Sequence, residues 1–131
     1  MSGVPYTRAQ IFLIKAAEDE AALLADGNPD TVLGFHAQQA VEKLIKALLS
    51  QLGVPFELTH NLERLETALL AAGETLPITS LPLDELTDYA VVYRYDMMTQ
   101  QSGPDRADLI QTVRLIREHV AARIAALAAT P

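Results

Sequence analysis

Tyrosine and arginine side chains gather in one short stretch of the chain, which runs YAVVYRYD from residue 89 to residue 96. It holds three of the four tyrosines, Tyr89, Tyr93 and Tyr95, together with Arg94 and Asp96. Arginine presents a rigid fork of donors that suits phosphate or carboxylate groups, and tyrosine rings stack on nucleobases. Such a group could bind a nucleotide or another phosphorylated ligand. From spacing alone, however, the structural alternative is favoured, with Tyr93 in the core and Arg94 paired with Asp96 or a neighbouring acid.

A second group of polar side chains follows one side of a strongly patterned segment, residues 35–52. The group consists of His36, Gln39, Lys43 and Lys46, which fall on one line at helical spacing. Glu42 precedes Lys46 by four residues, a pair that supports a helix by roughly 0.2–0.5 kcal/mol. The opposite side is apolar at steps of three and four residues, which predicts a core helix: Val41, Leu44, Ile45, Leu48, Leu49 and Leu52.

Motifs that identify the common enzyme classes are missing from the sequence. There is no phosphate-cradling glycine loop, no HExxH, no CxxC and no nucleophile elbow. The three histidines, His36, His60 and His119, lie on three different predicted elements, so we expect no metal site. No cofactor is expected either.

Composition and charge narrow the class of protein further. The 131 residues include no cysteine, which excludes disulfides, and no apolar run reaches the ~20 residues that span a bilayer. The N-terminus lacks the layout of a signal peptide, so we expect a cytoplasmic protein without a membrane partner. The net charge of −7 and the pI of about 4.8 disfavour indiscriminate binding of nucleic acid, although a local basic cleft is still compatible with them.

The hydrophobic pattern predicts one all-α domain over residues 1–131, an up-and-down bundle of about five helices. Single glycines at Gly27, Gly53 and Gly73 are typical of helix ends, and the short connection after Gly27 predicts that the first two helices are antiparallel neighbours. Asn61 is the expected N-cap of the third helix. The predicted helices cover residues 5–26, the segment from the capping turn at 28–30 to residue 52, and residues 61–72, 83–99 and 105–128, with a surface loop at 74–82.

The predicted helices also carry expectations about which faces are buried. The first is expected to bury Leu13, Ala17, Ala21 and Leu24 and to expose Glu18, Asp19 and Glu20. The last has a seam of apolar residues, Leu109, Val113, Ile116, Val120, Ile124 and Leu127. This seam and the broad apolar side of residues 35–52 predict a homodimer. The alternative is a central helix with three neighbours in the same chain.

Three segments together resemble the HEPN family, the higher eukaryotes and prokaryotes nucleotide-binding domain. They are the run AQQAVEKLIKALL within residues 35–52, the helix start Thr-His-Asn-Leu at residues 59–62, and the Arg-Tyr pair at Arg94 and Tyr95. In this order they cover nearly the whole chain. The resemblance implies a dimer of helical bundles that enclose a polar cleft. It also implies a possible partner, a minimal nucleotidyltransferase in a toxin–antitoxin-like pair.

The resemblance also allows a comparison with the ribonucleases of the family. Those members carry an Arg followed, after four to six residues, by a His that takes part in metal-independent cleavage through the RNA 2′-hydroxyl. Arg94 matches the Arg, but the positions that follow at this distance are Thr99, Gln100 and Gln101. Glutamine and threonine do not exchange protons near pH 7. The proline that often follows Arg-Tyr in relatives is Asp96 here, which adds negative charge beside Arg94.

Three hypotheses about function follow. We favour a non-catalytic module that binds a nucleotide or phosphorylated ligand through Arg94, Tyr95, Lys43 and Lys46. The second in order is a pure protein-interaction regulator, since an acidic surface suits a basic protein. The third is a ribonuclease toxin, with RNA as substrate, in which another histidine such as His60 or His119 replaces the missing base.

Overall fold

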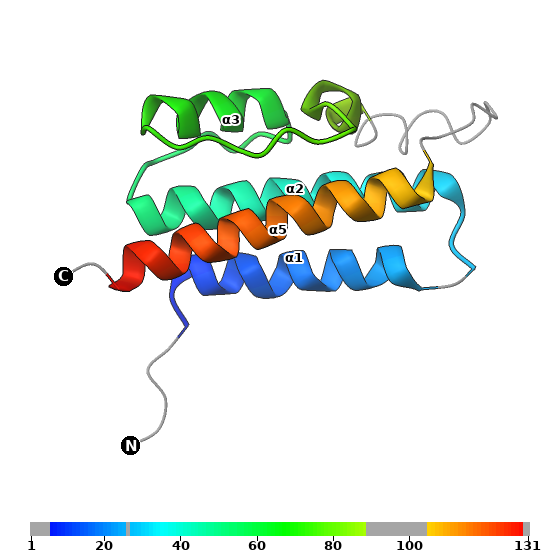
Figure 1. The fold of residues 1–131 in the computed structure, drawn as a ribbon, viewed down its shortest axis with the longest axis horizontal. Coiled ribbons are helices and arrows are strands. Elements are labelled where there is room, and N and C mark those ends of the chain that lie inside the picture. Colours follow the sequence, from blue (N-terminus) through cyan, green and yellow to red (C-terminus); the bar gives the residue numbers. More distant parts are fainter. Residues whose placement is uncertain (1–5, 26, 89–104, 130–131) are drawn as a thin grey trace, which may run out of the picture.

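A computed structural model describes residues 6–25, 27–88 and 105–129 of the chain, and its described part is all-helical (Figure 1). Three long helices, α1 (Arg8–Leu24), α2 (Asp30–Leu52) and α5 (Arg106–Ala129), run alongside one another. The shorter helix α3 (Leu62–Ala71) and a helical segment at 83–88 lie on the other side of α2 from α1. No strand occurs in the described ranges, and the predicted all-α bundle is confirmed.

The ends of α2 and α3 follow the predicted signals, whereas α1 begins at Arg8, three residues later than predicted, behind a cap that was not predicted. Thr7 and Gln10 form a capping box at the start of α1: the Thr7 hydroxyl accepts from the Gln10 amide at 3.1 Å, and the Gln10 side chain accepts from the Thr7 amide at 2.8 Å. The Asn61 side chain caps α3 by accepting from the Arg64 amide. Gly53 ends α2 with φ of 72°, the left-handed conformation that glycine adopts without a steric penalty. The turn after α1 makes α1 and α2 antiparallel, as predicted (Figure 1).

Helix α2 is the central element of the bundle, because it contacts α1, α3 and α5. Its predicted apolar side is buried, with Leu52 only partly covered, and further residues of α2 join the core. The α5 seam is buried from Leu109 to Val120 and partly buried at Ile124 and Leu127. Both apolar faces therefore pack within one chain. The alternative of a central helix with three neighbours is confirmed, and these two faces give no support to a homodimer.

The buried face predicted for α1 is wrong. Ala17, Ala21 and Leu24 are exposed, and Leu13 is only partly buried. The inward residues are Ala9, Ala16, Asp19 and Leu23. Apolar side chains occur on almost every side of this helix, so their spacing does not select one face.

Polar contacts with the neighbouring helices decide how α1 is rotated. Asp19, predicted to be solvated, is 8% exposed and faces α2, where it has two partners. Glu20, also predicted to be solvated, binds Arg117 of α5 at 2.8 Å, whereas Glu18 is exposed as expected. Burial of an acidic residue requires a partner, and a partner on another helix is invisible to a pattern within one helix.

The loop after α3 is fastened to α5 by a two-point ion pair. The Glu74 carboxylate is buried and accepts from Arg123 Nε at 2.9 Å and from Nη2 at 2.8 Å. These hydrogen bonds are the main cause that lowers the pKa of Glu74 from its ordinary value of 4.5; burial opposes them, and the nearby charges of Arg123 and His119 lower the pKa further. The same hydrogen bonds raise the pKa of Arg123.

The remaining predicted helix, residues 83–99, is confirmed only where it begins. The chain is helical at 83–88, and the rest of that prediction lies outside the described residues. Thr87 in this segment accepts a hydrogen bond from the Leu62 amide at 3.0 Å, which fastens the segment to the start of α3. Among the described helices none is both long and apolar enough to cross a membrane.

The Glu74–Arg123 pair predicts how stability depends on pH. Because the folded-state pKa of Glu74 lies below 4.5, the pair stabilises the fold fully above that pH, and its contribution is lost as the pH falls through the folded-state pKa. Glu74→Gln should therefore lower the urea midpoint at about pH 7 and lower it much less at about pH 3. Glu18→Gln, at an exposed site, serves as the control and should change little. An equal loss at both pH values in Glu74→Gln would contradict the assignment.

Candidate functional site

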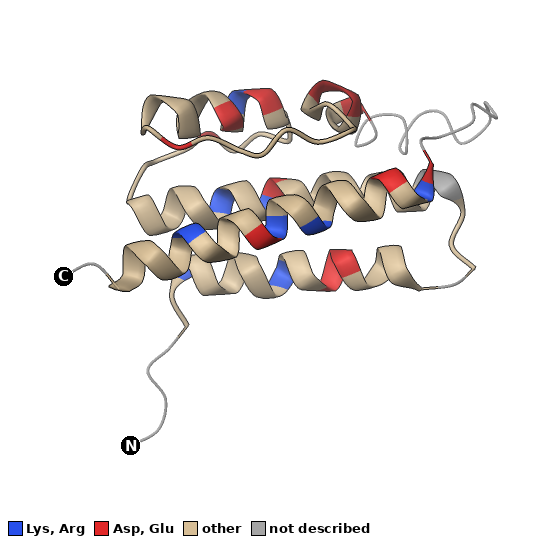
Figure 2. Cartoon of the chain, viewed as in Figure 1, with Lys and Arg blue, Asp and Glu red and all other residues tan. Residues whose placement is uncertain are grey.

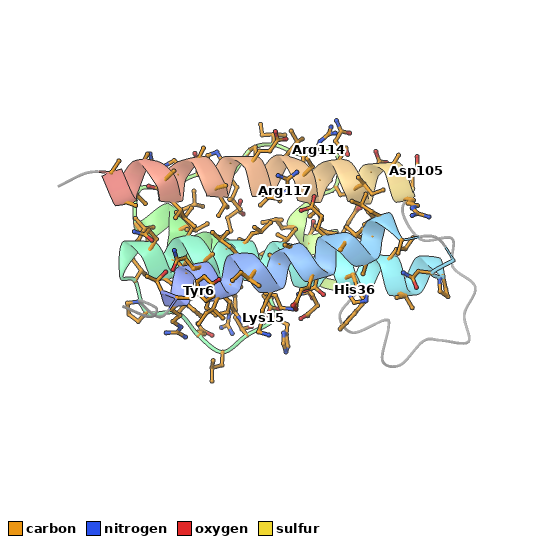
Figure 3. The ribbon with its side chains drawn as sticks, turned by 90° about the horizontal axis from the view of Figure 1, so that it is seen from below. Tyr6, Lys15, His36, Asp105, Arg114 and Arg117 are labelled. Atoms are coloured by element: carbon orange, nitrogen blue, oxygen red, sulfur yellow. The ribbon has the colours of Figure 1, made fainter. Side chains whose placement is uncertain are left out.

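The polar side of α2 carries two clusters, each built around a buried carboxylate. The first lies between α1 and α2. Asp19 of α1 accepts from His36 Nδ1 at 2.8 Å through one oxygen and from Lys43 Nζ through the other. The two α2 residues are seven apart, two helical turns, so both reach the same carboxylate. Figure 3 shows His36 at the edge where α1 and α2 lie together.

The second cluster lies between α2 and the connector that precedes α3. Glu42 is 4% exposed. One of its oxygens accepts from His60 Nδ1 at 2.8 Å and from Gln38 Nε2 at 3.1 Å, and the other accepts from Lys46 Nζ at 2.9 Å. The predicted Glu42–Lys46 pair is confirmed, but it is buried rather than solvated. Three donors on one carboxylate offset the cost of removing its charge from water.

Gln38 extends the second cluster into the backbone of the connector. The side chain is fully buried, and its Nε2 also donates to the His60 carbonyl at 2.9 Å. Its Oε1 accepts from Gln39 Nε2 at 2.7 Å. Two side chains of α2, Gln38 and Glu42, therefore hold both the backbone and the ring of His60 in place.

The two histidines have the same arrangement of ring nitrogens. In each, Nδ1 lies against a carboxylate oxygen, so Nδ1 carries the hydrogen, and in the neutral ring Nε2 is left as a proton acceptor. Such a carboxylate–histidine pair is a common arrangement for acid–base chemistry, and it is also a common structural contact. The His60 side chain is 59% exposed and that of His36 29% exposed, so His60 is the more accessible to a large ligand.

The predicted ligand-binding lysines have carboxylate partners within the fold. The Lys43 side chain is 24% exposed and that of Lys46 11%, so Lys46 is close to fully enclosed. Each charge is matched by Asp19 or Glu42, and a phosphate would have to compete with that carboxylate. Their role in binding stays a prediction, with Lys43 the better placed of the two.

Arg94 and Tyr95, the other predicted ligand-binding residues, lie outside the described residues. The stretch that contains them follows the helical segment at 83–88, which is fastened to the start of α3 two residues after His60. The prediction that Lys43 and Lys46 share a cleft with Arg94 is therefore not tested by the described geometry.

The Phe56 ring lies near Lys46 of the second cluster and near one further cation, Arg8. Lys46 Nζ lies 5.9 Å from the centre of the Phe56 ring and Arg8 Cζ lies 5.0 Å from it, both within the range of cation–π attraction. Arg8 has no carboxylate partner within the described ranges. A shallow pocket of about 240 Å³ adjoins the ring, lined by Arg8, Ser50, Gly53, Val54, Pro55 and Phe56. No group of three or more potential metal ligands occurs in the described part of the chain.

Comparison with known families identifies the chain. The family model for the HEPN domain matches residues 7–123, which is most of the sequence, and the chain therefore belongs to the HEPN family. Comparisons with curated proteins and with solved structures gave no significant match. Membership supports a helical module of the nucleotide-binding or ribonuclease-like kind.

Two of the segments that carry the family resemblance are in direct contact. Glu42 lies in the run AQQAVEKLIKALL and His60 in Thr-His-Asn-Leu, and these two residues form the 2.8 Å contact of the second cluster. The sequence indicates Glu42 only as a helix-stabilising partner of Lys46, the prediction that Asp19 is solvated is wrong, and Gln38 was not predicted. A signal was present in the sequence. Gln38 and Glu42 are polar residues four apart beside the apolar face of the helix, and buried polar groups of this kind predict a polar contact with a neighbouring element.

Proposed function

We propose that this HEPN-family chain is a non-catalytic module that binds a nucleotide or phosphorylated ligand in a cleft between two subunits. One observation carries the proposal: the family match includes Arg94, yet Thr99, Gln100 and Gln101 stand where a ribonuclease of the family has its histidine. The chain thus keeps the phosphate-binding side chain without the adjacent acid–base group. The resemblance adds a minimal nucleotidyltransferase as protein partner, which co-purification with the product of a neighbouring gene would test.

In the proposed complex four residues contact the ligand, each in a different way. Arg94 binds phosphate through its fork, and Tyr95 stacks on the base. Lys43 and Lys46 add positive charge from α2. On binding, Lys43 Nζ would donate to the ligand phosphate instead of to Asp19. The affinity for the ligand is therefore expected to depend on the loss of the Lys43–Asp19 hydrogen bond as well as on Arg94.

Isothermal titration calorimetry with ATP, GTP and their diphosphates tests the proposal. At least one nucleotide should bind, and Arg94→Ala should weaken binding by about tenfold or more, because charged hydrogen bonds contribute roughly 1.5–3 kcal/mol. Arg114→Ala is the matched control, since Arg114 is an exposed arginine of α5 whose closest carboxylate atom is 3.9 Å away. A response to none of the nucleotides, or an equal effect of both variants, would reject this function.

The dimer in this proposal is supported by the outer face of α1. Ile11 and Ile14 are each 44% exposed and Leu24 is 59% exposed, so this face offers aliphatic side chains that the chain itself does not cover. Lys15 lies on the same side of the molecule as His36 (Figure 3). Contact between two α1 helices would therefore bring the polar edges of two subunits close to each other, as a shared cleft requires.

Light scattering tests the α1 contact. The wild-type protein should have twice the 14.3 kDa mass of one chain, and Ile14→Glu should reduce it to that of a single chain, because a charge in an apolar contact is unfavourable. Leu58→Glu is the control, since Leu58 is 94% exposed on the connector and should leave the mass unchanged. A wild-type monomer, or a dimer that survives Ile14→Glu, would argue against this interface.

A metal-independent ribonuclease is the second candidate, and the Glu42–His60 pair is the observation that favours it. With Nδ1 held by Glu42, His60 Nε2 is available to take the proton from an RNA 2′-hydroxyl. The resulting alkoxide attacks the adjacent phosphorus, the bond to the 5′-oxygen breaks, and a proton passes to that leaving oxygen. The products are a 2′,3′-cyclic phosphate and a 5′-hydroxyl.

Cleavage of RNA in the presence of EDTA separates the two candidates. If the second holds, His60→Ala should lower the cleavage rate by roughly 10²–10⁴-fold, the usual contribution of a general base. Glu42→Gln should lower it less, and His36→Ala, at the less exposed pair, should leave it near the wild-type rate. An inactive wild-type protein, or full activity in His60→Ala, excludes this role for His60.

A further inference from the structure

A groove lies on the α3 side of the bundle, between that helix and the loop that leads to the segment at 83–88. Its volume is about 410 Å³. Leu76, Ile78 and Leu83 give it an apolar lining, and Glu63, Glu66 and Asp84 place carboxylates around that lining. Nothing in the α2 clusters contributes to this groove, so its chemistry is separate from that of the candidate site.

The carboxylates of the groove have no counter-ions within the described ranges. Among the residues that the structure describes, the carboxylates of Glu63, Glu66 and Asp84 form no ion pair and accept no hydrogen bond, whereas those of Asp19, Glu42 and Glu74 are all paired. Residues 57–88 contain seven acidic residues and one basic residue. Figure 2 shows the result: acidic residues predominate on α3 and the 83–88 segment, and the basic residues lie mostly on the long helices. The negative charge of the protein is therefore concentrated around this groove.

The apolar lining is presented by a loop that internal contacts hold in shape. Ile78 is 98% exposed and follows Pro77, whose ring restricts the backbone. The Thr79 hydroxyl donates to the Leu81 carbonyl at 2.8 Å, and Leu81 is buried in the core. Ile78 is thus an exposed aliphatic side chain on a loop of fixed shape, next to a groove with unpaired carboxylates. Such a combination is typical of a protein contact surface.

The charge around the groove selects the kind of partner. Carboxylates repel RNA, nucleotides and membranes that carry anionic lipids. No described group of acids is arranged to hold a metal ion. A protein segment that places an aliphatic or aromatic side chain between lysines or arginines satisfies both the apolar lining and the acidic rim. We propose that this groove docks such a segment of a basic protein partner.

This docking surface does not depend on the nucleotide function proposed above. It uses α3 and the loop at 76–84, whereas the candidate ligand residues of the described part lie on α2. A failure of nucleotide binding would leave the proposal standing, and loss of docking would leave nucleotide binding in place. Both can therefore be measured on the same protein and judged separately.

Fluorescence anisotropy with a labelled peptide of alternating lysine and leucine tests the groove. The wild-type protein should bind it with an affinity that falls as salt is raised. Ile78→Ser should weaken binding by about tenfold, as for an apolar anchor, and Glu66→Lys by about tenfold through reversal of a rim charge. The matched controls are Leu58→Ser, at another exposed aliphatic residue, and Glu18→Lys, at an unpaired acid of α1; both should bind like wild type.

Several results would overturn the proposal. One is absence of binding, and another is equal weakening by the groove variants and their controls, since that would mean only general attraction to an acidic protein. Equal binding of a peptide with glutamate in place of lysine would do the same. If light scattering finds self-association that Ile78→Ser abolishes, the groove belongs to a second copy of the chain and not to a basic partner. Unchanged melting temperatures of the four variants establish that each measurement reports on docking.

Discussion

The buried carboxylate of Glu42 is the constraint on which the arrangement around α2 depends. A charged group with 4% exposure is tolerated only where donors satisfy it, and here Lys46, His60 and Gln38 do so. Lys46 and Gln38 come from the same helix, one turn on either side. His60 comes from the connector between α2 and α3. Its contact with the Glu42 carboxylate therefore fixes the position of the connector relative to α2.

This constraint links the core to the accessible surface. Helix α2 cannot rotate to expose Glu42, because Leu44, Ile45 and Leu48 of the same helix are buried in the core and would leave it. The His60 ring is therefore held at one place on the surface by the packing of the helix that carries Glu42. Asp19 does the same for His36 and Lys43, across the α1–α2 contact. Removing one partner of such a buried pair leaves an unpaired charge, which costs far more than the pair itself contributes.

The extent to which the sequence predicts this structure differs between elements for a physical reason. Helix α2 and the seam of α5 have one apolar side, and both buried faces follow from spacing alone. Caps such as Asn61 and Gly53 depend on residues within one turn, so they too are local. Helix α1 has apolar residues on most sides, and its rotation is decided by Asp19 through contacts seventeen and twenty-four residues away. Information of this kind is absent from a single-helix pattern.

The candidate site is less predictable than the fold for the same reason. Lys43 and Lys46 were found by their spacing, but spacing does not reveal that each has a carboxylate partner, and these partners change what the lysines can do. A paired lysine attracts an anion only to the extent that the anion replaces its carboxylate. Arg94 and Tyr95 rest on the family resemblance and lie beyond the described residues.

Charge is distributed so that two kinds of ligand cannot share one face. At the α2 edge the two buried carboxylates, Asp19 and Glu42, are each paired with a lysine, which reduces the repulsion of an anion there. Around the groove beside α3, the carboxylates of Glu63, Glu66 and Asp84 have no ion-pair partner among the described residues, and the field there favours cations. The phosphate ligand proposed for the α2 edge would therefore meet paired carboxylates rather than uncompensated ones. The basic partner proposed for the groove beside α3 would bind on a separate face, so the two proposed ligands would not compete for one surface.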